Sequence, residues 1–155
     1  MQSPRVALFS TVEHQKADWL KPAYRDQIAA SAPAPAPARP ESVTFAGWAE
    51  ITEVMPLSEP ALAAGLTPFH IWTEAWALER LAWKPQQPLL ALCLRTYRFA
   101  EPQQVAYQPQ FGGCRSWVPL PSALTTIGSV PVLSDRAYDQ QVAAIQAVLS
   151  RVRTG

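Results

Sequence analysis

The longest run of apolar positions lies between Leu89 and Leu94, and an alternating stretch follows it directly. Six residues without a polar interruption are typical of a strand that is covered on both faces. From Arg95 to Phe99 the pattern changes to alternation, so that Arg95, Tyr97 and Phe99 share one face and Thr96 and Arg98 the other. This stretch predicts one strand near the centre of the fold.

A second strand is predicted after a glycine turn. Gly112 and Gly113 tolerate a positive φ, which suits a tight turn after a long connection. Residues 114–120 (CRSWVPL) then form the strand, which the prolines at 119 and 121 end. We expect these two strands to form the middle of a small β-rich core.

Three further stretches favour strands at other places in the chain. Arg5 to Val12 is mostly apolar and begins close to the first residue. Val43 to Val54 alternates at its end, and Gly47 inside it indicates a bulge. Val130 to Leu133 is long enough only for a short edge strand.

Four stretches have the spacing or the capping residues of helices. Residues 16–30 are predicted to be helical with a fresh start at Pro22. Ser58 and Thr73 are placed to cap helices over 59–64 and up to Trp83. Ser134 is placed to cap the last helix, over 135–152. That helix has one apolar stripe, made by Tyr138, Val142, Ile145, Leu149 and Val152.

These elements predict an α+β class: a mostly antiparallel sheet or a small β-barrel, with peripheral helices and an amphipathic C-terminal helix. Residues 31–40 (SAPAPAPARP) are rich in proline and alanine, which favours extended chain. The roughly 30 residues before them are too few to fold alone. We therefore interpret 31–40 as an exposed loop within a single domain over 1–155.

Composition narrows the class of protein. Thirteen basic and twelve acidic residues leave a net charge of +1, which argues against a strongly charged nucleic-acid or membrane-surface protein. Two cysteines are too few for a disulfide framework and fit a reducing compartment. The start has no apolar leader, and no run approaches the roughly 18 apolar residues of a membrane span. We expect a soluble, cytoplasmic protein.

Several motifs together resemble a bacterial family. The chain is similar to the domain of unknown function 1802 family, which is common in cyanobacteria, from residue 5 to about residue 140. The motifs are FSTVEHQ (9–15), LKPAY (20–24), HIWTEAW (70–76), the run from Arg80 through PLLALCLRTYRF, and GGCRSWVPL (112–120). The resemblance implies no particular reaction. Family members usually start with a further strand–turn segment that contains Lys-Gly-Gly-Ile, and this chain lacks it. We therefore expect either that the start has been trimmed or that a neighbouring chain or a rearranged edge replaces that strand.

The order of elements is more distantly similar to PUA-like barrels of the ASCH and EVE types. AEITEV, a helical excursion, LRTYRFAEPQQV and GGCRSWVPL follow one another as comparable segments do in those barrels. Such barrels commonly bind RNA or modified DNA bases. The resemblance implies a nucleic-acid-binding module, although a fold does not fix a function.

Candidate site residues are those at strand ends and helix starts, where side chains often line a rim. Hydrogen-bonding groups there can contact the edge of a base, and a tryptophan can stack on it. The predicted ligand-binding residues are Glu13, His14, Gln15, His70, Trp72, Arg95 and Trp117. We expect His70 and Trp117 to belong to one constellation.

Catalysis and metal binding have weaker support in the sequence. Cys114 beside a histidine could act as a nucleophile, but an unreactive buried thiol explains it as well. Two cysteines and two histidines match the ligand count of zinc, but they lack the close pairs of structural sites. We predict no catalytic residue, metal or cofactor.

The leading hypothesis is a non-catalytic module that recognises RNA or DNA. The alternatives are a subunit completed by a partner's strand and a small Cys/His enzyme.

Overall fold

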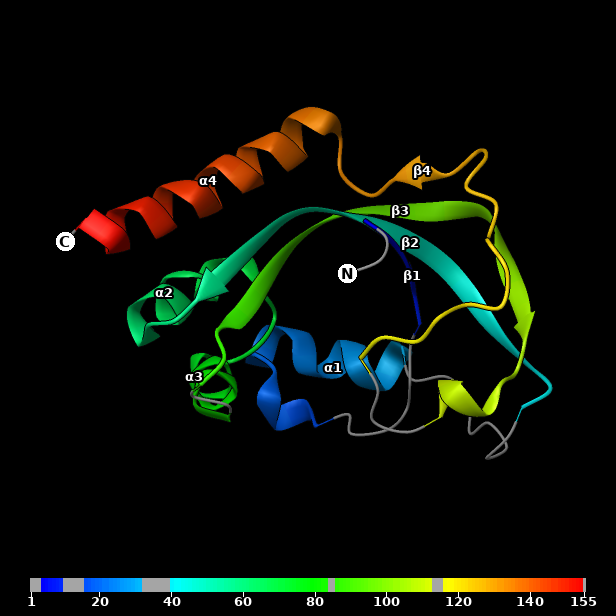
Figure 1. Cartoon of the computed structure of the whole chain (residues 1–155), viewed down its shortest axis with the longest axis horizontal. Helices are drawn as coiled ribbons and strands as arrows, with labels where there is room; N and C mark the ends of the chain where they lie inside the picture. The colour runs from blue at the N-terminus through cyan, green and yellow to red at the C-terminus, as the bar shows by residue number, and fades with distance from the viewer. Residues whose placement is uncertain (1–3, 10–15, 32–39, 84–85, 113–115, 155) are drawn as a thin grey trace. The chain divides into compact units, whose positions relative to one another are not determined.

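Four strands in the order β1-β2-β3-β4 form one open antiparallel sheet in the described part of the chain (Figure 1). The structure is a computed structural model that describes residues 4–9, 16–31, 40–83, 86–112 and 116–154. The strands are β1 (Arg5–Leu8), β2 (Ser42–Leu57), β3 (Leu89–Ala106) and β4 (Val130–Pro131). The predicted α+β class is confirmed, and of the two predicted forms it is the open sheet that these strands adopt.

The helices also follow the predicted pattern. They are α1 (Pro22–Ser31), α2 (Pro60–Gly65), α3 (Glu74–Trp83) and α4 (Asp135–Thr154), with short 3-10 turns η1 (Ala17–Trp19), η2 (Thr67–Phe69) and η3 (Pro109–Phe111). The predicted fresh start at Pro22 is confirmed. None of the helices in the described ranges is both long enough and apolar enough to cross a bilayer.

Backbone contacts divide the chain into two compact units. The first comprises Met1–Gln15, Ala32–Ile51 and Arg95–Val132, and the second comprises Lys16–Ser31, Thr52–Leu94 and Leu133–Gly155. The boundary falls inside β2 and inside β3. The predicted single domain over 1–155 stays a prediction, and the predicted loop at 31–40 falls mostly on residues outside the described ranges.

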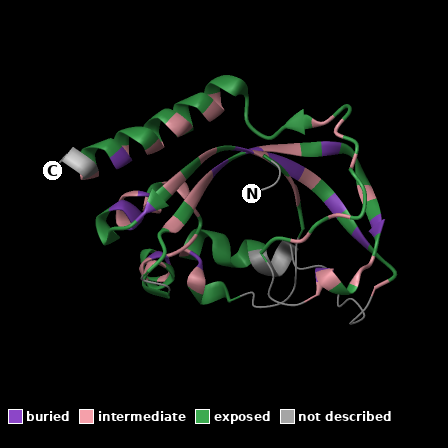
Figure 2. Ribbon diagram, viewed as in Figure 1, coloured by how far each residue is buried: buried purple, intermediate pink, exposed green. Residues whose placement is uncertain are grey.

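The core of the first unit lies on one face of its strands. Alternation places Val43, Phe45, Phe99 and Val105 inside, and Figure 2 shows this alternation along β2 and β3. Trp48 and Tyr97 stack with ring centroids 4.3 Å apart at 9°. The indole Nε1–H of Trp48 also donates to Oγ of Ser129 at 3.0 Å. These contacts fix the inner face of the unit.

Gly47 lies where the backbone of β3 comes close. Its pairing with β1 shows no bulge, because the register is continuous with Leu8 opposite Gly47, and a bulge toward β3 stays a prediction. A Cβ atom at position 47 would lie 2.6 Å from the carbonyl oxygen of Tyr97. Because glycine has no side chain, the backbone of Tyr97 can lie this close to position 47.

The strand predicted over 114–120 is wrong for residues 116–120, which form no strand. Pro119 and Pro121 lack the N–H groups that a ladder needs. The Gln110 side-chain amide donates to Pro119 O at 2.9 Å. Beyond the predicted strand, the Gln103 side chain exchanges two bonds with the Thr125 backbone. Residues 118, 120 and 124 still pack against the core.

The core of the second unit is built from aliphatic side chains. Leu57, Leu62, Leu66 and Leu149 are buried together, and Leu149 comes from the predicted apolar stripe of α4. The prediction that Leu89 to Leu94 is covered on both faces is wrong, because Leu90 is 51% exposed and Leu94 is 38% exposed. An apolar run by itself does not show which face of the strand is exposed to solvent.

Two of the three predicted side-chain caps are confirmed. Thr73 Oγ1 accepts from the Trp76 N–H at 3.3 Å, and Ser134 Oγ accepts from the Ala137 N–H at 3.3 Å. The predicted Ser58 cap is wrong, since α2 has Glu59 at its N-cap and no side-chain cap bond. Pro60 stands at the first helical position and has no N–H, so fewer donors there need a cap.

Candidate functional site: an apolar cavity in the second unit

Two segments of the second unit pair with each other and so position His70 and Trp72. Leu20 and Trp72 form an isolated antiparallel bridge. The Lys21 N–H donates to Ile71 O at 2.9 Å, and the Thr73 N–H donates to Trp19 O at 2.8 Å. Leu20 is almost fully buried, so the segment before α1 is anchored where it meets residues 70–73.

The Lys21 side chain holds the turn that precedes this pairing. Its ammonium group donates to the carbonyl oxygens of both Thr67 and His70. The carbonyls of the first residue of η2 and of the residue that follows η2 thus gain a charged partner, and charge-assisted bonds of this kind are stronger than neutral ones. Lys21 therefore fixes the backbone of His70 and is itself engaged.

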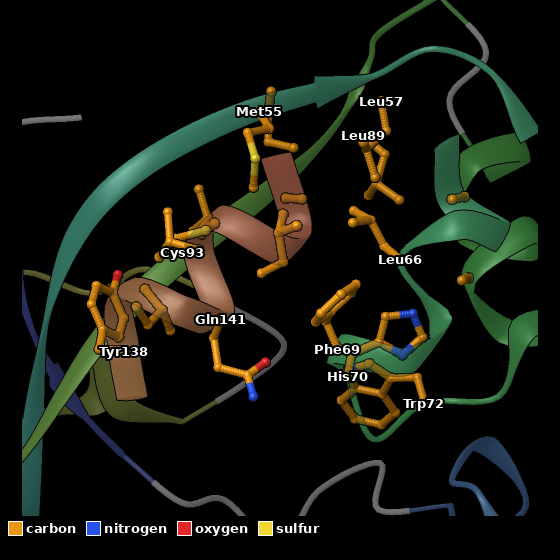
Figure 3. Close-up of a pocket in the computed structure, with 18 of the residues that line it drawn as sticks. Met55, Leu57, Leu66, Phe69, His70, Trp72, Leu89, Cys93, Tyr138 and Gln141 are labelled. Carbon is orange, nitrogen blue, oxygen red and sulfur yellow. The ribbon is translucent and has the colours of Figure 1, made fainter. Parts of the chain in front are cut away.

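A cavity of about 630 Å³ opens beside this turn (Figure 3). Its walls come from β2, α2, η2, α3, β3 and α4, and every lining residue belongs to the second unit. The lining residues are mostly aliphatic or aromatic: Met55, Leu57, Ala63, Leu66, Phe69, His70, Trp72, Trp76, Ala77, Leu89, Leu90, Ala91, Leu92, Cys93, Leu94, Leu133, Tyr138, Gln141, Val142 and Ile145. None of these described residues is Asp, Glu, Lys or Arg.

His70 is held in the neutral form. Burial lowers its pKa from the ordinary 6.5, and the nearby Lys21 charge lowers it further. A hydrogen bond with the Trp72 backbone opposes these effects by raising the pKa. Because the net effect lowers the pKa below 6.5, the ring is mostly uncharged at neutral pH.

One ring nitrogen of His70 has no partner. Nδ1 is buried and makes no hydrogen bond within the described part of the chain. A buried polar atom without a partner costs about 1–3 kcal/mol, so Nδ1 is a weak point in the packing around this turn.

Figure 3 shows Cys93 and Tyr138 on the side of the cavity opposite His70 and Trp72. Cys93 is buried, and burial together with the charge of Glu53 raises the pKa of its thiol. The Tyr138 hydroxyl is hydrogen-bonded to Thr52 Oγ1, which also donates to Cys93 O at 3.3 Å. This side therefore presents a neutral thiol and an already bonded hydroxyl.

Tryptophan rings form an aromatic part of the wall. Trp72 and Trp76 stack with ring centroids 4.4 Å apart at 23°, and both line the cavity. Trp19 contacts Trp76 from another direction, at 6.3 Å between centroids. Large flat rings of this kind offer contact area to a planar ligand.

The predicted site residues fall into three groups. His70 and Trp72 both line the cavity of the second unit, whereas Arg95 and Trp117 belong to the first unit. Glu13, His14 and Gln15 lie outside the described residues, as does Cys114. The constellation of His70 with Trp117 stays a prediction.

Arg95 and Trp117 have different surroundings in the first unit. Arg95 is buried, and its guanidinium lies 5.6 Å from the centre of the Tyr97 ring. Tyr97 in turn stacks on Trp48, and the Arg5 guanidinium lies 5.4 Å from the centre of the Trp48 ring. Trp117 is 55% exposed. Arg95 thus belongs to a packed series of rings and cations, while part of the Trp117 ring faces solvent.

Sequence reasoning missed several residues of the cavity. The sequence pattern places Tyr138 only in the apolar stripe of the last helix and Cys93 only in the apolar run from Leu89 to Leu94, whereas both line the cavity. Gln141 was not singled out. Its position one turn after Tyr138 on α4 was the only signal, because i and i+3 lie on the same side of a helix. No group of three His, Cys, Asp or Glu residues suited to a metal occurs among the described residues.

Comparison with known families identifies the chain. The model of a family described as a domain of unknown function (DUF1802) matches residues 1–144. The chain belongs to this family. The DUF1802 match confirms the resemblance seen in the sequence motifs. No curated protein and no solved structure matches the chain.

Proposed function

We propose that this DUF1802 protein is a non-catalytic binding module whose second unit holds a small, largely apolar ligand. The observation that carries the proposal is the uncharged lining of the cavity beside His70 and Trp72. Its volume of about 630 Å³ lies in the range of roughly 300–1,000 Å³ typical of small-molecule sites. Such sites are mostly apolar with a few polar groups that set orientation.

The arrangement of polar groups favours binding over catalysis. A cysteine nucleophile needs a thiolate and a nearby base. The pKa of Cys93 is raised, and its side chain lies across the cavity from His70. The described lining also lacks a carboxylate that could act as a general base.

Calorimetric titration with 2-naphthol, a planar and mostly apolar probe, tests the proposal. Ala77 is buried on α3 and lines the cavity, so Ala77→Phe should fill the space and abolish binding. Ala75 is exposed on the same helix and is absent from the lining, so Ala75→Phe is the matched control and should bind normally. Absence of binding to the unmodified protein, or equal binding by the Ala77→Phe variant, would refute the proposal.

Recognition of nucleic acid is a second candidate, favoured by the exposed ring of Trp117. An aromatic ring open to solvent can stack on an unpaired base, which contributes about 1–3 kcal/mol per base. Single-stranded and double-stranded DNA and RNA should be titrated at low salt, where phosphate contacts are strongest. Binding that Trp117→Ala removes and Trp83→Ala retains supports this function, since Trp83 is also exposed. Equal loss in both variants counts against it.

A third candidate function is the binding of a protein partner that adds a strand to the sheet. The order of the strands favours one edge for this addition. β1 and β4 are the outer strands of the described sheet. Pro131 leaves β4 without one N–H, which weakens that edge for pairing. β1 is therefore the edge at which an added strand would bind. A purified chain that stays monomeric in light scattering at all concentrations would oppose addition by a second copy.

A further inference from the structure

Gln141 is a polar residue at the mouth of the cavity. It lines the cavity and is also exposed, so its side chain lies where the cavity meets solvent. The other exposed lining residues in the described ranges are Leu90, Leu94 and Leu133. Figure 3 shows the Gln141 side chain directed from α4 toward the side of the cavity that carries Phe69 and Trp72. The mouth therefore combines exposed leucines with one amide group.

The amide of Gln141 is available to a ligand. Its oxygen accepts a hydrogen bond and its NH2 group donates, so this one side chain can pair with a neutral group that does both. Neither amide atom bonds to another group of the described part of the chain. Two other polar side chains of α4 are engaged: the Tyr138 hydroxyl bonds to Thr52 Oγ1, and the Gln146 amide donates to Glu53.

The interior of the cavity does not suit a polar or charged head group. The Tyr138 hydroxyl is already bonded, and Cys93 is a buried, neutral thiol, which is a weak donor. The described lining has no acidic or basic side chain, so an ionised group would lose its hydration without gaining a counter-ion. The favourable arrangement places the apolar part of a molecule inside and its polar head at the mouth, beside Gln141.

We infer that the ligand is an uncharged amphiphile whose apolar body fills the cavity and whose neutral head, a carboxamide or a hydroxyl, hydrogen-bonds to the amide of Gln141. Gln141 is then the residue that selects neutral heads over charged ones. This inference rests on the proposed function, since it names the class of ligand that the same cavity takes.

Three probes that share the rings of 2-naphthol differ only in the head group. 2-Naphthamide donates and accepts hydrogen bonds. 2-Acetylnaphthalene has a methyl group in place of the NH2 and only accepts, and 2-naphthoate is an anion of nearly the same shape. In calorimetric titration of the unmodified protein at neutral pH, 2-naphthoate should bind most weakly, because it loses hydration without gaining a counter-ion.

Substitutions at position 141 assign the preference to this residue. Gln141→Leu keeps a side chain of similar size but removes both amide atoms. The affinity for 2-naphthamide should fall about 10-fold and that for 2-acetylnaphthalene about 3-fold, as expected for the loss of two hydrogen bonds and of one. Gln141→Arg supplies a counter-ion at the mouth and should raise the affinity for 2-naphthoate about 3-fold.

The preceding residue provides the matched control. Gln140 is exposed on the same helix and is absent from the lining, so Gln140→Leu and Gln140→Arg should leave all the affinities unchanged. Leucine and arginine favour a helix about as well as glutamine does, so all of these variants should fold. Thermal melts check that they do.

Several outcomes would overturn the inference: an equal fall in Gln141→Leu and Gln140→Leu, no gain for 2-naphthoate in Gln141→Arg, or tighter binding of 2-naphthoate than of 2-naphthamide. Binding of 2-naphthol without binding of any of these probes would overturn it too. In each case, 2-naphthol binding that Ala77→Phe abolishes leaves the proposed function standing. If neither 2-naphthol nor any of the probes binds, the proposed function fails and the inference fails with it. The order of 2-naphthamide and 2-naphthoate on the unmodified protein tests the inference even where a variant does not fold.

Discussion

Gly65 and Val148 meet where α2 packs against α4: a Cβ atom at position 65 would lie 2.7 Å from Cγ1 of Val148. Real Cβ atoms do not approach so closely, and the β-branched valine has little freedom to turn away. Gly65→Ala should therefore lower the free energy of unfolding by about 1–3 kcal/mol, the usual cost of overpacking. Denaturant unfolding measures the change.

The control for this prediction is a double-mutant cycle. Val148→Ala removes the atom in the way, so Gly65→Ala introduced into that background should be neutral or stabilising. Alanine is the better helix former by about 0.5–1 kcal/mol, which favours the stabilising result. Strict additivity of the two substitutions would mean that α2 and α4 do not touch at this point.

The helix caps give a second prediction. Thr73 Oγ1 accepts the N–H of Trp76, whereas Ser58 makes no cap bond to α2. Thr73→Ala should destabilise the chain by about 1 kcal/mol, and Ser58→Ala should change its stability by less than about 0.5 kcal/mol. Thr73→Ser keeps the hydroxyl and should restore most of the loss. Thermal melts that rank Ser58→Ala as the costlier variant would contradict the assignment.

The same pair illustrates how far the sequence could be used. Both Ser58 and Thr73 precede an apolar periodic stretch, and the boundaries of both helices followed from that pattern. Which hydroxyl accepts a bond depends on local backbone geometry, and for α2 the residue at the N-cap is Glu59. Propensity and spacing locate an element within a few residues, but they do not determine one hydrogen bond at its end.

The candidate site was predictable only in part, for a related reason. His70 and Trp72 could be identified because they stand just before a helix cap. Tyr138 lies 68 positions after His70 in the sequence, and no local pattern relates the two. The strand predicted over 114–120 is wrong for residues 116–120, where the Gln110 side chain bonds to Pro119 O. The local pattern of the chain shows neither relationship.

Stability should depend on pH through His70. Its pKa is lowered in the folded chain, so between that lowered value and 6.5 the unfolded chain binds more protons than the folded one. The contribution is fully present above about pH 6.5 and is lost as the pH falls through 6.5 toward the folded pKa. Chemical unfolding at a series of pH values should show this decline.

The variant His70→Phe isolates the effect. Other groups titrate equally in both proteins, so the difference in free energy of unfolding between them should change only in this pH interval. Stability of the unmodified protein that rises on acidification from neutral pH, relative to the variant, would mean that the imidazolium is favoured in the fold.

The two tryptophans of the first unit should respond very differently to truncation. Trp48 is 8% exposed, stacks on Tyr97 and donates to Ser129, whereas Trp117 is 55% exposed. Trp48→Ala should cost about 3–5 kcal/mol, as expected for a buried aromatic residue. Trp117→Ala removes a ring already half in water, so its cost should stay below about 1 kcal/mol.

Paired melts and binding curves on these variants also test the role predicted for Trp117. If Trp117→Ala loses little stability but no longer binds nucleic acid, the ring belongs to a ligand surface, because the folded chain then lacks only a stacking partner. Trp48→Phe serves as the reference variant, because it keeps a ring for Tyr97 but removes the N–H that bonds to Ser129. Its melting temperature should lie between those of Trp48→Ala and the unmodified protein. A loss of several kcal/mol in Trp117→Ala would place this side chain in the core and end its candidacy as a binding residue.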